Sequence, residues 1–272
     1  MGCEPCKNPV RILKNSEFDR FTLLEWIGLA IGNSRLHWAW FQKGELIAAW
    51  DTAHPAPELA PLAFFHQNSG LPADAAFADL PIYIASVVPA QTAFWQTCPQ
   101  AQLLTLEQIP LRGLYPTLGI DRALALWGAV DRNKLPALVI DAGTALTFTG
   151  ANAQQEFIGG AILPGLTLQR RSLSDQTAAL PLIQPSKDLP PRWAKTTAEA
   201  IGSGIFYTVL SGIKDFISNW EQEFGQGAIV LTGGDAPSLM HGLKAQHPEL
   251  AQKITIDPHL LFRGMQAIVE QG

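Results

Sequence analysis

The chain has 272 residues, 47% of them hydrophobic, and carries a formal net charge of −5. This length and composition suffice for a substantial core, in one large or two medium domains. Its Lys and Arg residues are scattered, which argues against nucleic acid because phosphate-backbone binding needs a concentrated basic face. No apolar run reaches the roughly 18 residues of a membrane span. We therefore expect no membrane partner and a cytoplasmic protein that binds a small molecule.

The three cysteines are Cys3, Cys6 and Cys98, an odd number that supports neither a disulfide framework nor a zinc site. Cys3 and Cys6 form a CxxC pair, but it lies in a polar stretch rather than at a strand-to-helix junction, which disfavours a redox role. Residues 1–25 show no sustained periodicity. We expect them to be a flexible leader.

The first half predicts a sheet that opens with three adjacent strands. Apolar or alternating segments at 26–31, 35–42 and 45–50 are separated by turn residues. Further along, the pattern predicts a buried strand at 81–88, a small helix at 91–95 and a helix at 120–132.

The second half begins in the same way. Strands are expected at 137–140, 145–149, 157–163, 228–231 and 254–256, with a long helix at 196–224 and a helix from residue 259 onward. Gly202 and Gly204 inside the long helix indicate either the close approach of a backbone or ligand, or simple helix packing.

A short internal echo supports duplication of the fold. Residues 29–34 and 140–145 are similar, and each copy ends an apolar strand and opens a three-strand meander. This is the pattern of a duplicated α/β lobe. We place the lobes at 26–135 and 136–272.

Common catalytic motifs are absent from the sequence, which contains no P-loop, GxGxxG, GxSxG or HExxH. What remains is a set of glycine turns after apolar strands, at 32–34, 141–147, 159–165 and 232–235. Glycine lets backbone N–H groups approach phosphate oxygens closely, and a neighbouring Ser or Thr adds a hydroxyl donor. Asp141, at a strand end, is suited to hold a cation that bridges phosphates.

Asp121 and Arg122 stand at the start of the predicted helix at 120–132. Asp121 can accept a hydroxyl proton during phosphoryl transfer, and Arg122 can bind a carboxylate or phosphate through two hydrogen bonds. A helix cap beside a surface ion pair is the alternative for these two residues.

The ordered set of turns resembles type III pantothenate kinase, a family of the acetate and sugar kinase, heat-shock ATPase and actin superfamily. The matching segments are 31–34, 119–122, 141–147, 159–165, 177–181, 197–201 and 232–235. The resemblance implies two duplicated actin-like (ribonuclease H-like) lobes, each a mixed sheet flanked by helices. It also implies ATP-dependent phosphorylation of pantothenate to 4′-phosphopantothenate, the first step of coenzyme A synthesis.

By this resemblance Asp121 is the general base and Asp141 holds a monovalent cation. The expected pantothenate contacts are Gly119, Ile120, Asp121, Arg122 and Thr197. The expected ATP contacts are Ala30, Ile31, Gly32, Asn33, Ser34, Arg35, Leu36, His37, Thr144, Gly233 and Gly234. The family also implies Mg²⁺, K⁺ or NH₄⁺, and a homodimer whose pantothenate sites lie near the interface.

Two positions depart from the family pattern. The opening motif normally starts with Asp, where this chain has Ala30, so one metal-facing carboxylate is missing. Tyr115 lies closer to Gly119 than the family's substrate-contacting Tyr, and we leave it outside the expected site. Two alternatives stay open at this point: a kinase for another small hydroxylated acceptor, and a non-catalytic regulator that binds pantothenate or nucleotide.

Overall fold

The computed structural model describes residues 25–271 except 56–59, 70–79, 133–134 and 187. The CxxC pair and the expected leader lie outside these residues, apart from Glu25, which begins the first strand. Among the described helices, none combines the length and apolar character needed to cross a bilayer.

The strands form two sheets of five. The first contains β1 (Glu25–Ile31), β2 (Leu36–Gln42), β3 (Glu45–Thr52), β4 (Ile82–Ser86) and β5 (Ala101–Leu103). The second contains β6 (Ala137–Ala142), β7 (Ala145–Ala151), β8 (Phe157–Pro164), β9 (Ala228–Thr232) and β10 (Ile254–Ile256).

The helices of the first half are α1 (Pro61–Asn68), α2 (Pro89–Trp95), the short 3₁₀ helix Leu106–Gln108 and α3 (Ile120–Arg132). Those of the second half are α4 (Leu166–Gln176), α5 (Thr197–Phe224), α6 (Ala236–Gln246), α7 (Pro248–Ala251) and α8 (Leu260–Val269).

The two sheets have the same topology, which confirms the predicted duplication. The first runs β3-β2-β1-β4-β5 and the second β8-β7-β6-β9-β10. In each sheet the first three strands form an antiparallel meander, and the fourth and fifth strands run parallel to the first. The fold is therefore two actin-like lobes, each a mixed sheet flanked by helices. The lobe boundary at residue 135 stays a prediction, because α8 follows the second sheet in sequence but contacts β1 of the first.

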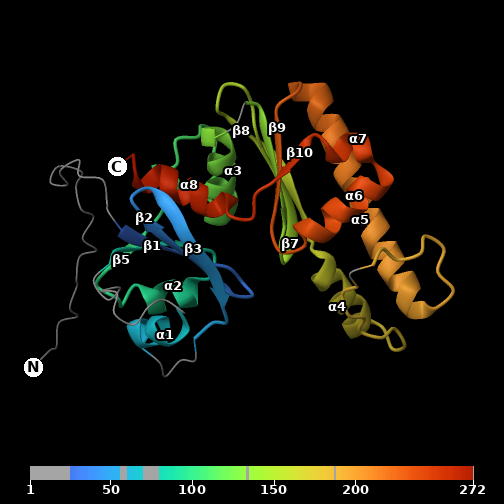
Figure 1. Cartoon of the computed structure of the whole chain (residues 1–272), viewed down its shortest axis with the longest axis horizontal. Coiled ribbons are helices and arrows are strands. Elements are labelled where there is room, and N and C mark those ends of the chain that lie inside the picture. The colour runs from blue at the N-terminus through green and yellow to red at the C-terminus, as the bar shows by residue number, and fades with distance from the viewer. Residues whose placement is uncertain (1–24, 56–59, 70–79, 133–134, 187, 272) are drawn as a thin grey trace, which may run out of the picture.

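Figure 1 shows five layers: α1 and α2, the first sheet, α3 with α8, the second sheet, and then α5 with α6. Residues along β1 alternate between two cores, since Trp26 and Ala30 face α3 and α8 whereas Ile27 and Leu29 face α1 and α2. The central strands are buried on both faces, which explains why they read as continuous apolar runs.

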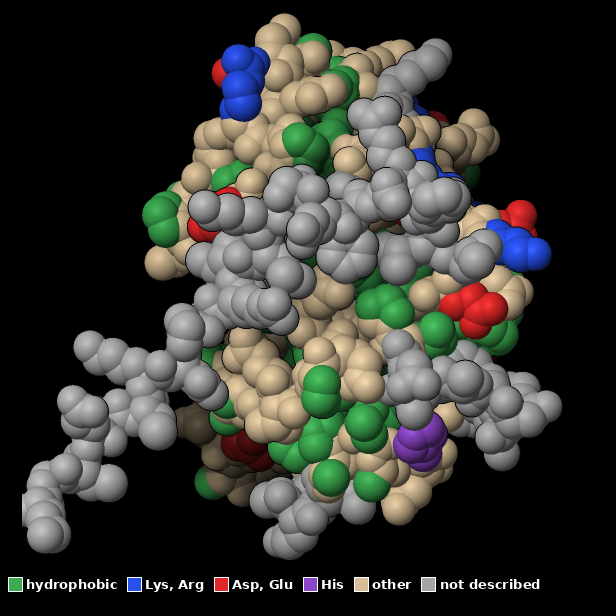
Figure 2. Space-filling view, turned by 90° about the vertical axis from the view of Figure 1, so that its left-hand side faces the viewer, with side chains coloured by type: hydrophobic (Ala, Val, Ile, Leu, Met, Phe, Trp, Pro, Cys, Tyr) green, Lys and Arg blue, Asp and Glu red, His purple; other side chains and the backbone are tan. Residues whose placement is uncertain are grey.

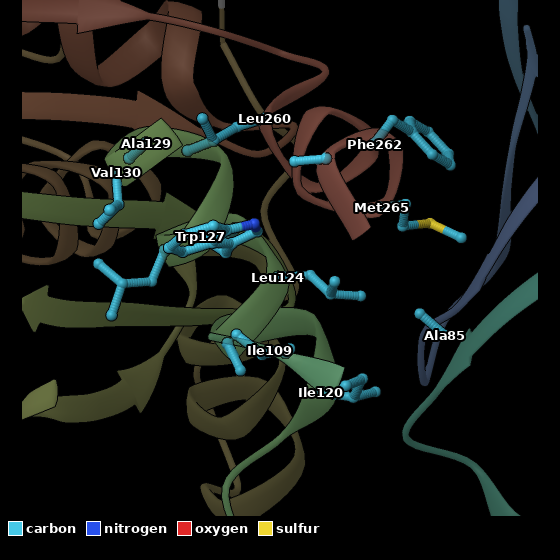
Figure 3. Close-up of a cluster of buried hydrophobic side chains, with 14 of the residues drawn as sticks. Ala85, Ile109, Ile120, Leu124, Trp127, Ala129, Val130, Leu260, Phe262 and Met265 are labelled. Carbon is cyan, nitrogen blue, oxygen red and sulfur yellow. The ribbon is translucent and has the colours of Figure 1, made fainter. Parts of the chain in front are cut away.

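A single hydrophobic cluster, here called the inter-lobe core, fills the layer between the sheets. It joins Trp26 and Phe41 of the first sheet to Val139 and Val230 of the second through side chains of α3 and α8. Figure 3 shows Leu124 and Trp127 of α3 close to Leu260 and Met265 of α8. The lobes therefore share one core.

Helices α3 and α8 cross at two glycines. A methyl group on Gly264 would overlap the backbone carbonyl oxygen of Leu124, and one on Gly128 would lie 2.8 Å from the Gly264 nitrogen. Contacts this close leave no room for a Cβ atom. Both glycines are thus required for the two backbones to touch.

The sequence analysis missed three helices of the second half, namely α4, α6 and the four-residue α7. Helix α4 is mostly polar, and Leu166 is its one fully buried residue, so it lacks a continuous apolar stripe. Helix α6 begins with Ala236 and has Pro237 in its first turn, where proline is favourable. Its Gly242 weighs against a helix, yet this glycine packs directly on the Phe206 ring of α5. Tertiary contact outweighs propensity there.

Gly264→Ala should destabilise the fold by about 3 kcal/mol or more, because relieving the overlap with Leu124 requires α3 and α8 to separate. Gly212→Ala in α5 is the matched control: a Cβ there meets no atom within 4 Å, so this variant should be neutral or up to about 1 kcal/mol more stable. Chemical denaturation of the purified proteins measures both. Equal effects would contradict the backbone-contact explanation.

Candidate active site

The candidate site lies where parallel strands of both lobes end. In the first sheet Ile31 of β1 pairs with Ser86 of β4, and in the second Asp141 of β6 pairs with Thr232 of β9. The predicted glycine turns at 32–34, 141–147 and 232–235 lie at the ends of β1, β6 and β9. The fourth prediction, a turn at 159–165, was wrong, because residues up to Pro164 belong to strand β8 itself. Ligands of open α/β sheets bind at the carboxyl ends of such strands.

One hydrogen bond joins the turns of the two lobes. The hydroxyl oxygens of Ser34 and Thr144 lie 2.8 Å apart, although 110 residues separate them in sequence. A glycine N–H closes each turn, but the turns differ in size: the Gly32 N–H donates to the carbonyl of Arg35, three residues ahead, and the Gly143 N–H to that of Ala145, two residues ahead, both at 3.1 Å. Two glycine turns therefore meet across the lobes.

The turn at Gly233 closes the same region from the second lobe. Gly233 has a φ of +90°, and a Cβ atom on it would lie 2.5 Å from Asp141 Oδ1 and equally close to the Ala142 backbone. The Asp235 N–H donates to the Ala142 carbonyl at 2.9 Å. Glycine is thus required at 233 on both conformational and steric grounds.

Asp121 and Asp141 form a pair of partly buried acids. Burial raises the pKa of Asp141 to about 6, with a further contribution from the negative charge of Asp121. Burial also raises the pKa of Asp121, opposed by the backbone N–H of Arg122, which donates to Asp121 Oδ1 at 2.8 Å, and by the Arg122 charge. Two carboxylates from different lobes therefore act on each other electrostatically.

This acid pair is suited to a cation. Carboxylate oxygens are preferred ligands of Mg²⁺. A bound positive charge would offset both the burial and the repulsion from Asp121 that together raise the pKa of Asp141. Within the described residues no three His, Cys, Asp or Glu side chains converge on one point. A divalent ion there would need phosphate oxygens and water to complete its coordination, as is usual for Mg²⁺ bound with a nucleotide.

Arg122 is almost fully buried beside the acids, with 9% of its surface exposed. Its guanidinium donates to the Thr149 hydroxyl at 3.2 Å, the Phe148 carbonyl at 3.2 Å and the Tyr115 hydroxyl at 3.3 Å. None of these acceptors is charged, and the described residues place no carboxylate within salt-bridge distance of Arg122. A buried guanidinium in this setting favours an anionic ligand.

Sequence reasoning missed the residues that hold Arg122 in place. Tyr115, left outside the expected site, supplies one acceptor, and Thr149 supplies another. Gly160 of β8 borders the same guanidinium, since a Cβ there would overlap the Phe148 carbonyl oxygen and lie 2.7 Å from Arg122 Nη2. A Cβ on the preceding glycine would meet no atom within 4 Å, so Gly160 alone leaves room for the guanidinium.

Several expected ATP or pantothenate contacts can offer only their backbone. The side chains of Ile31, Leu36 and Ile120 are buried in hydrophobic clusters, and Ala30 faces the inter-lobe core. Around them Gly32, Asn33 and Ser34 form the turn itself, with Asn33 and Ser34 exposed. Gly119 is packed against the Asp121 carboxylate, where a Cβ would lie 2.5 Å from Oδ1.

Thr197 lies apart from the other expected site residues. It is exposed at the first turn of α5, and α5 covers the face of the second sheet opposite to α3, as Figure 1 shows. Asp121 and Arg122 are on α3. One chain therefore presents Thr197 and the acid pair on different sides of the same sheet.

The chain is similar to known proteins over most of its length. Residues 26–219 match the family model described as type III pantothenate kinase. A type III pantothenate kinase from a Nostoc species is 46% identical, covering 90% of this chain and 94% of the relative, and one from a Synechocystis species is 42% identical, covering 89% and 90%.

Among solved structures, a Baf family transcriptional activator from Campylobacter jejuni is similar, with a TM-score of 0.62 and 21% identity over 90% of this chain and 98% of that one. The ethanolamine utilization protein EutJ from Carboxydothermus hydrogenoformans has a TM-score of 0.53 at 11% identity, over 93% and 92%. These structures bear on the fold alone. The family match and the sequence relatives, which cover nearly the whole chain, show that this protein belongs to the type III pantothenate kinase family.

Proposed function

We propose that this protein is an enzyme that transfers the γ-phosphoryl group of ATP to the primary hydroxyl of pantothenate. The products are 4′-phosphopantothenate and ADP, in the first step of coenzyme A biosynthesis. The observation that carries the proposal is the 2.8 Å contact between Ser34 and Thr144, since it brings two phosphate-type turns together beside the Asp121 and Asp141 pair.

In this reaction the chain acts mainly by positioning and charge stabilisation. The turn from Ala30 to His37 and the turns at Thr144 and at Gly233–Gly234 surround the nucleotide with N–H and hydroxyl donors. Asp121 accepts the proton of the pantothenate hydroxyl as that oxygen bonds to the γ-phosphorus. The bond from the γ-phosphorus to the bridging oxygen breaks, and ADP leaves with the electron pair. The raised pKa of Asp121 makes it a stronger base than an exposed carboxylate.

Asp121 and Asp141 would bind the cations that the reaction needs. Asp141 would hold K⁺ or NH₄⁺, and Asp121 with Asp141 and water would serve Mg²⁺ in the absence of the carboxylate missing at Ala30. When bound, these ions neutralise negative charge on the transferring phosphoryl group.

Arg122 is placed to bind the carboxylate of pantothenate. Its guanidinium is already oriented by Thr149, Phe148 and Tyr115, so little side-chain entropy remains to be lost on binding. Gly119 and Ile120 would contribute backbone groups at the same turn. A carboxylate acceptor also compensates the buried positive charge.

The proposed working form is a homodimer. Ile158 and Ile162 are 41% and 64% exposed on the same face of β8 as Gly160, the residue that borders Arg122. A second copy covering these side chains would bury apolar surface beside the acceptor site. It could also bring its own Thr197 to pantothenate, which Thr197 of the same chain does not approach.

We place the protein in the cytoplasm, with pantothenate and ATP as its partners and no role in nucleic acid or membrane binding. On the face in Figure 2, the Lys and Arg side chains of the described residues are few and separated. That face therefore presents few positively charged groups to a polyanion.

Release of ADP by the purified protein with ATP and Mg²⁺ tests the function directly. We expect turnover that requires pantothenate and that K⁺ stimulates. A panel of other hydroxylated acceptors tests substrate choice in the same assay. Binding of pantothenate or nucleotide without turnover would contradict the proposal.

Asp121→Asn should reduce kcat by about a hundredfold or more, because an amide cannot accept the hydroxyl proton. Affinity for ATP, measured by calorimetry, should stay close to that of the wild type. Asp131→Asn, on an exposed position of the same helix, is the control and should keep full activity. Near-normal turnover of Asp121→Asn would remove Asp121 from the mechanism.

Asp141→Asn should stabilise the protein at neutral pH in the absence of cations and nucleotide. The folded-state pKa of Asp141 is about 6, above the unfolded value, so its contribution is lost as pH rises from about 4 through 6. One pKa unit corresponds to about 1.4 kcal/mol, which makes the expected gain a few kcal/mol. Thermal unfolding between pH 4 and 8 should show a weaker fall for the variant. The same variant should lose K⁺ stimulation, and parallel unfolding curves would contradict the assignment.

Ala30→Asp should lower the Mg²⁺ concentration that gives half-maximal rate, because it restores a carboxylate to the end of β1. Ala30 is 4% exposed, so the variant should also be less stable. Ala30→Asn separates charge from size and should leave the Mg²⁺ requirement unchanged. An unchanged or raised requirement in Ala30→Asp would count against this account of the missing carboxylate.

A further inference from the structure

Three neighbouring strands place Ala30, His37 and Asp51 in one row across the first sheet. Ala30 of β1 pairs directly with His37 of β2, and His37 pairs directly with Asp51 of β3. Residues that are directly opposite on adjacent strands share a face of the sheet. Asp51 therefore lies on the face that carries the proposed nucleotide turn, although the sequence had given it no role.

Asp51 uses its two carboxylate oxygens on two different basic residues. Oδ1 lies 2.7 Å from His37 Nδ1, and Oδ2 accepts a hydrogen bond from Arg35 Nη1 at 3.0 Å. All three side chains are about half exposed. We call this group of Arg35, His37 and Asp51 the basic clamp.

The basic clamp borders the turn of the first lobe. Gly32, Asn33 and Ser34 come immediately before Arg35, whose carbonyl closes the turn on the Gly32 N–H at 3.1 Å. With Nδ1 turned to Asp51, His37 points its Nε2 toward the turn, 3.9 Å from where a Cβ of Gly32 would be. Ser34 in turn reaches Thr144 at 2.8 Å. The clamp thus stands next to the meeting point of the two turns.

We propose that Asp51 is a positioning residue for ATP binding: it holds Arg35 and His37 in orientations in which they contact the triphosphate. This inference rests on the proposed function, because it assumes that ATP occupies the turn. An exposed Arg side chain samples many rotamers, and restricting it before ATP arrives removes an entropic cost from binding. Asp51 fixes the Arg35 guanidinium and accepts the hydrogen of His37 Nδ1, which turns Nε2 toward the turn. An imidazole that carries hydrogens on both nitrogens then donates from Nε2 to a phosphate oxygen.

The direction in which ATP affinity changes on removal of the Asp51 charge distinguishes a positioning role from a purely electrostatic one. Asp51 is itself negative, so if only its field mattered, removing that charge would strengthen the binding of a polyanion. If Asp51 acts by holding Arg35 and His37, removing the charge weakens ATP binding instead. The two accounts predict opposite directions.

Asp51→Asn should raise KM for ATP by about five- to tenfold, the size expected when a charge-assisted hydrogen-bond pair is lost. KM for pantothenate should change less than twofold, and the melting temperature should hardly move because exposed ion pairs contribute little to stability. Calorimetry should give the same loss of affinity for ATP. The nucleotide AMP, which has a single phosphate, should be affected less.

Glu221→Gln is the matched control. Glu221 also uses both carboxylate oxygens, each 2.8 Å from Lys253 Nζ, but it lies near the end of α5 rather than at the glycine turns. This variant should leave both KM values unchanged.

A double variant that lacks both basic side chains tests whether Asp51 acts through Arg35 and His37. In the double variant Arg35→Gln, His37→Gln, adding Asp51→Asn should cause no further rise in KM for ATP, because contacting residues that act together are non-additive. An additive rise, a lower KM in Asp51→Asn alone, or equal changes for ATP and pantothenate would each overturn the proposal. Since calorimetry detects ATP binding without turnover, the role of Asp51 can fail while pantothenate phosphorylation stands, and the reverse.

Discussion

The backbone contact between α3 and α8 is the constraint on which the arrangement of the lobes depends. Gly128 and Gly264 let the two helices touch, and the side chains around them fill the space between the sheets. Helix α3 carries Asp121 and Arg122 at its first turn, so its placement also sets the site. Because α3 packs on β6 and β7 as well as on β4, one helix fixes Asp121 and Arg122 relative to strand ends of both lobes.

Given this placement of α3, the ends of the parallel strands and the glycines beside them set the position of the candidate site. Parallel pairing of β6 with β9 brings Asp141 beside the Gly233 turn, and parallel pairing of β1 with β4 does the same for Ile31 and Ser86. The glycines at 160 and 233 then leave room for Arg122 and Asp141, respectively. Burial of charged groups is costly, and clusters of such groups are typical of functional sites, which agrees with the proposed binding of a substrate and a cation here.

Local pattern was sufficient to predict most strands and the long helix, since their apolar periodicity is strong. The glycine turns after β1, β6 and β9 were also predictable, whereas the role of Asp121 stays a prediction that rests on the order of motifs in a known family. Sequence could not reveal that Tyr115 and Thr149 hold Arg122, or that Asp51 faces His37, because these contacts depend on strand register and on packing between distant segments. Helix α6 was missed for the same kind of reason, since its Gly242 is favoured only by the Phe206 ring beside it.

The hydroxyl pair of Ser34 and Thr144 bears on how readily product leaves. Each hydroxyl has the other as its partner at 2.8 Å. If the proposed nucleotide separates them, it exchanges one hydrogen bond for others rather than adding all of its bonds to unpaired groups, which reduces the enthalpy of association. On the same proposal the pair reforms when ADP leaves, which lowers the free-energy cost of product release.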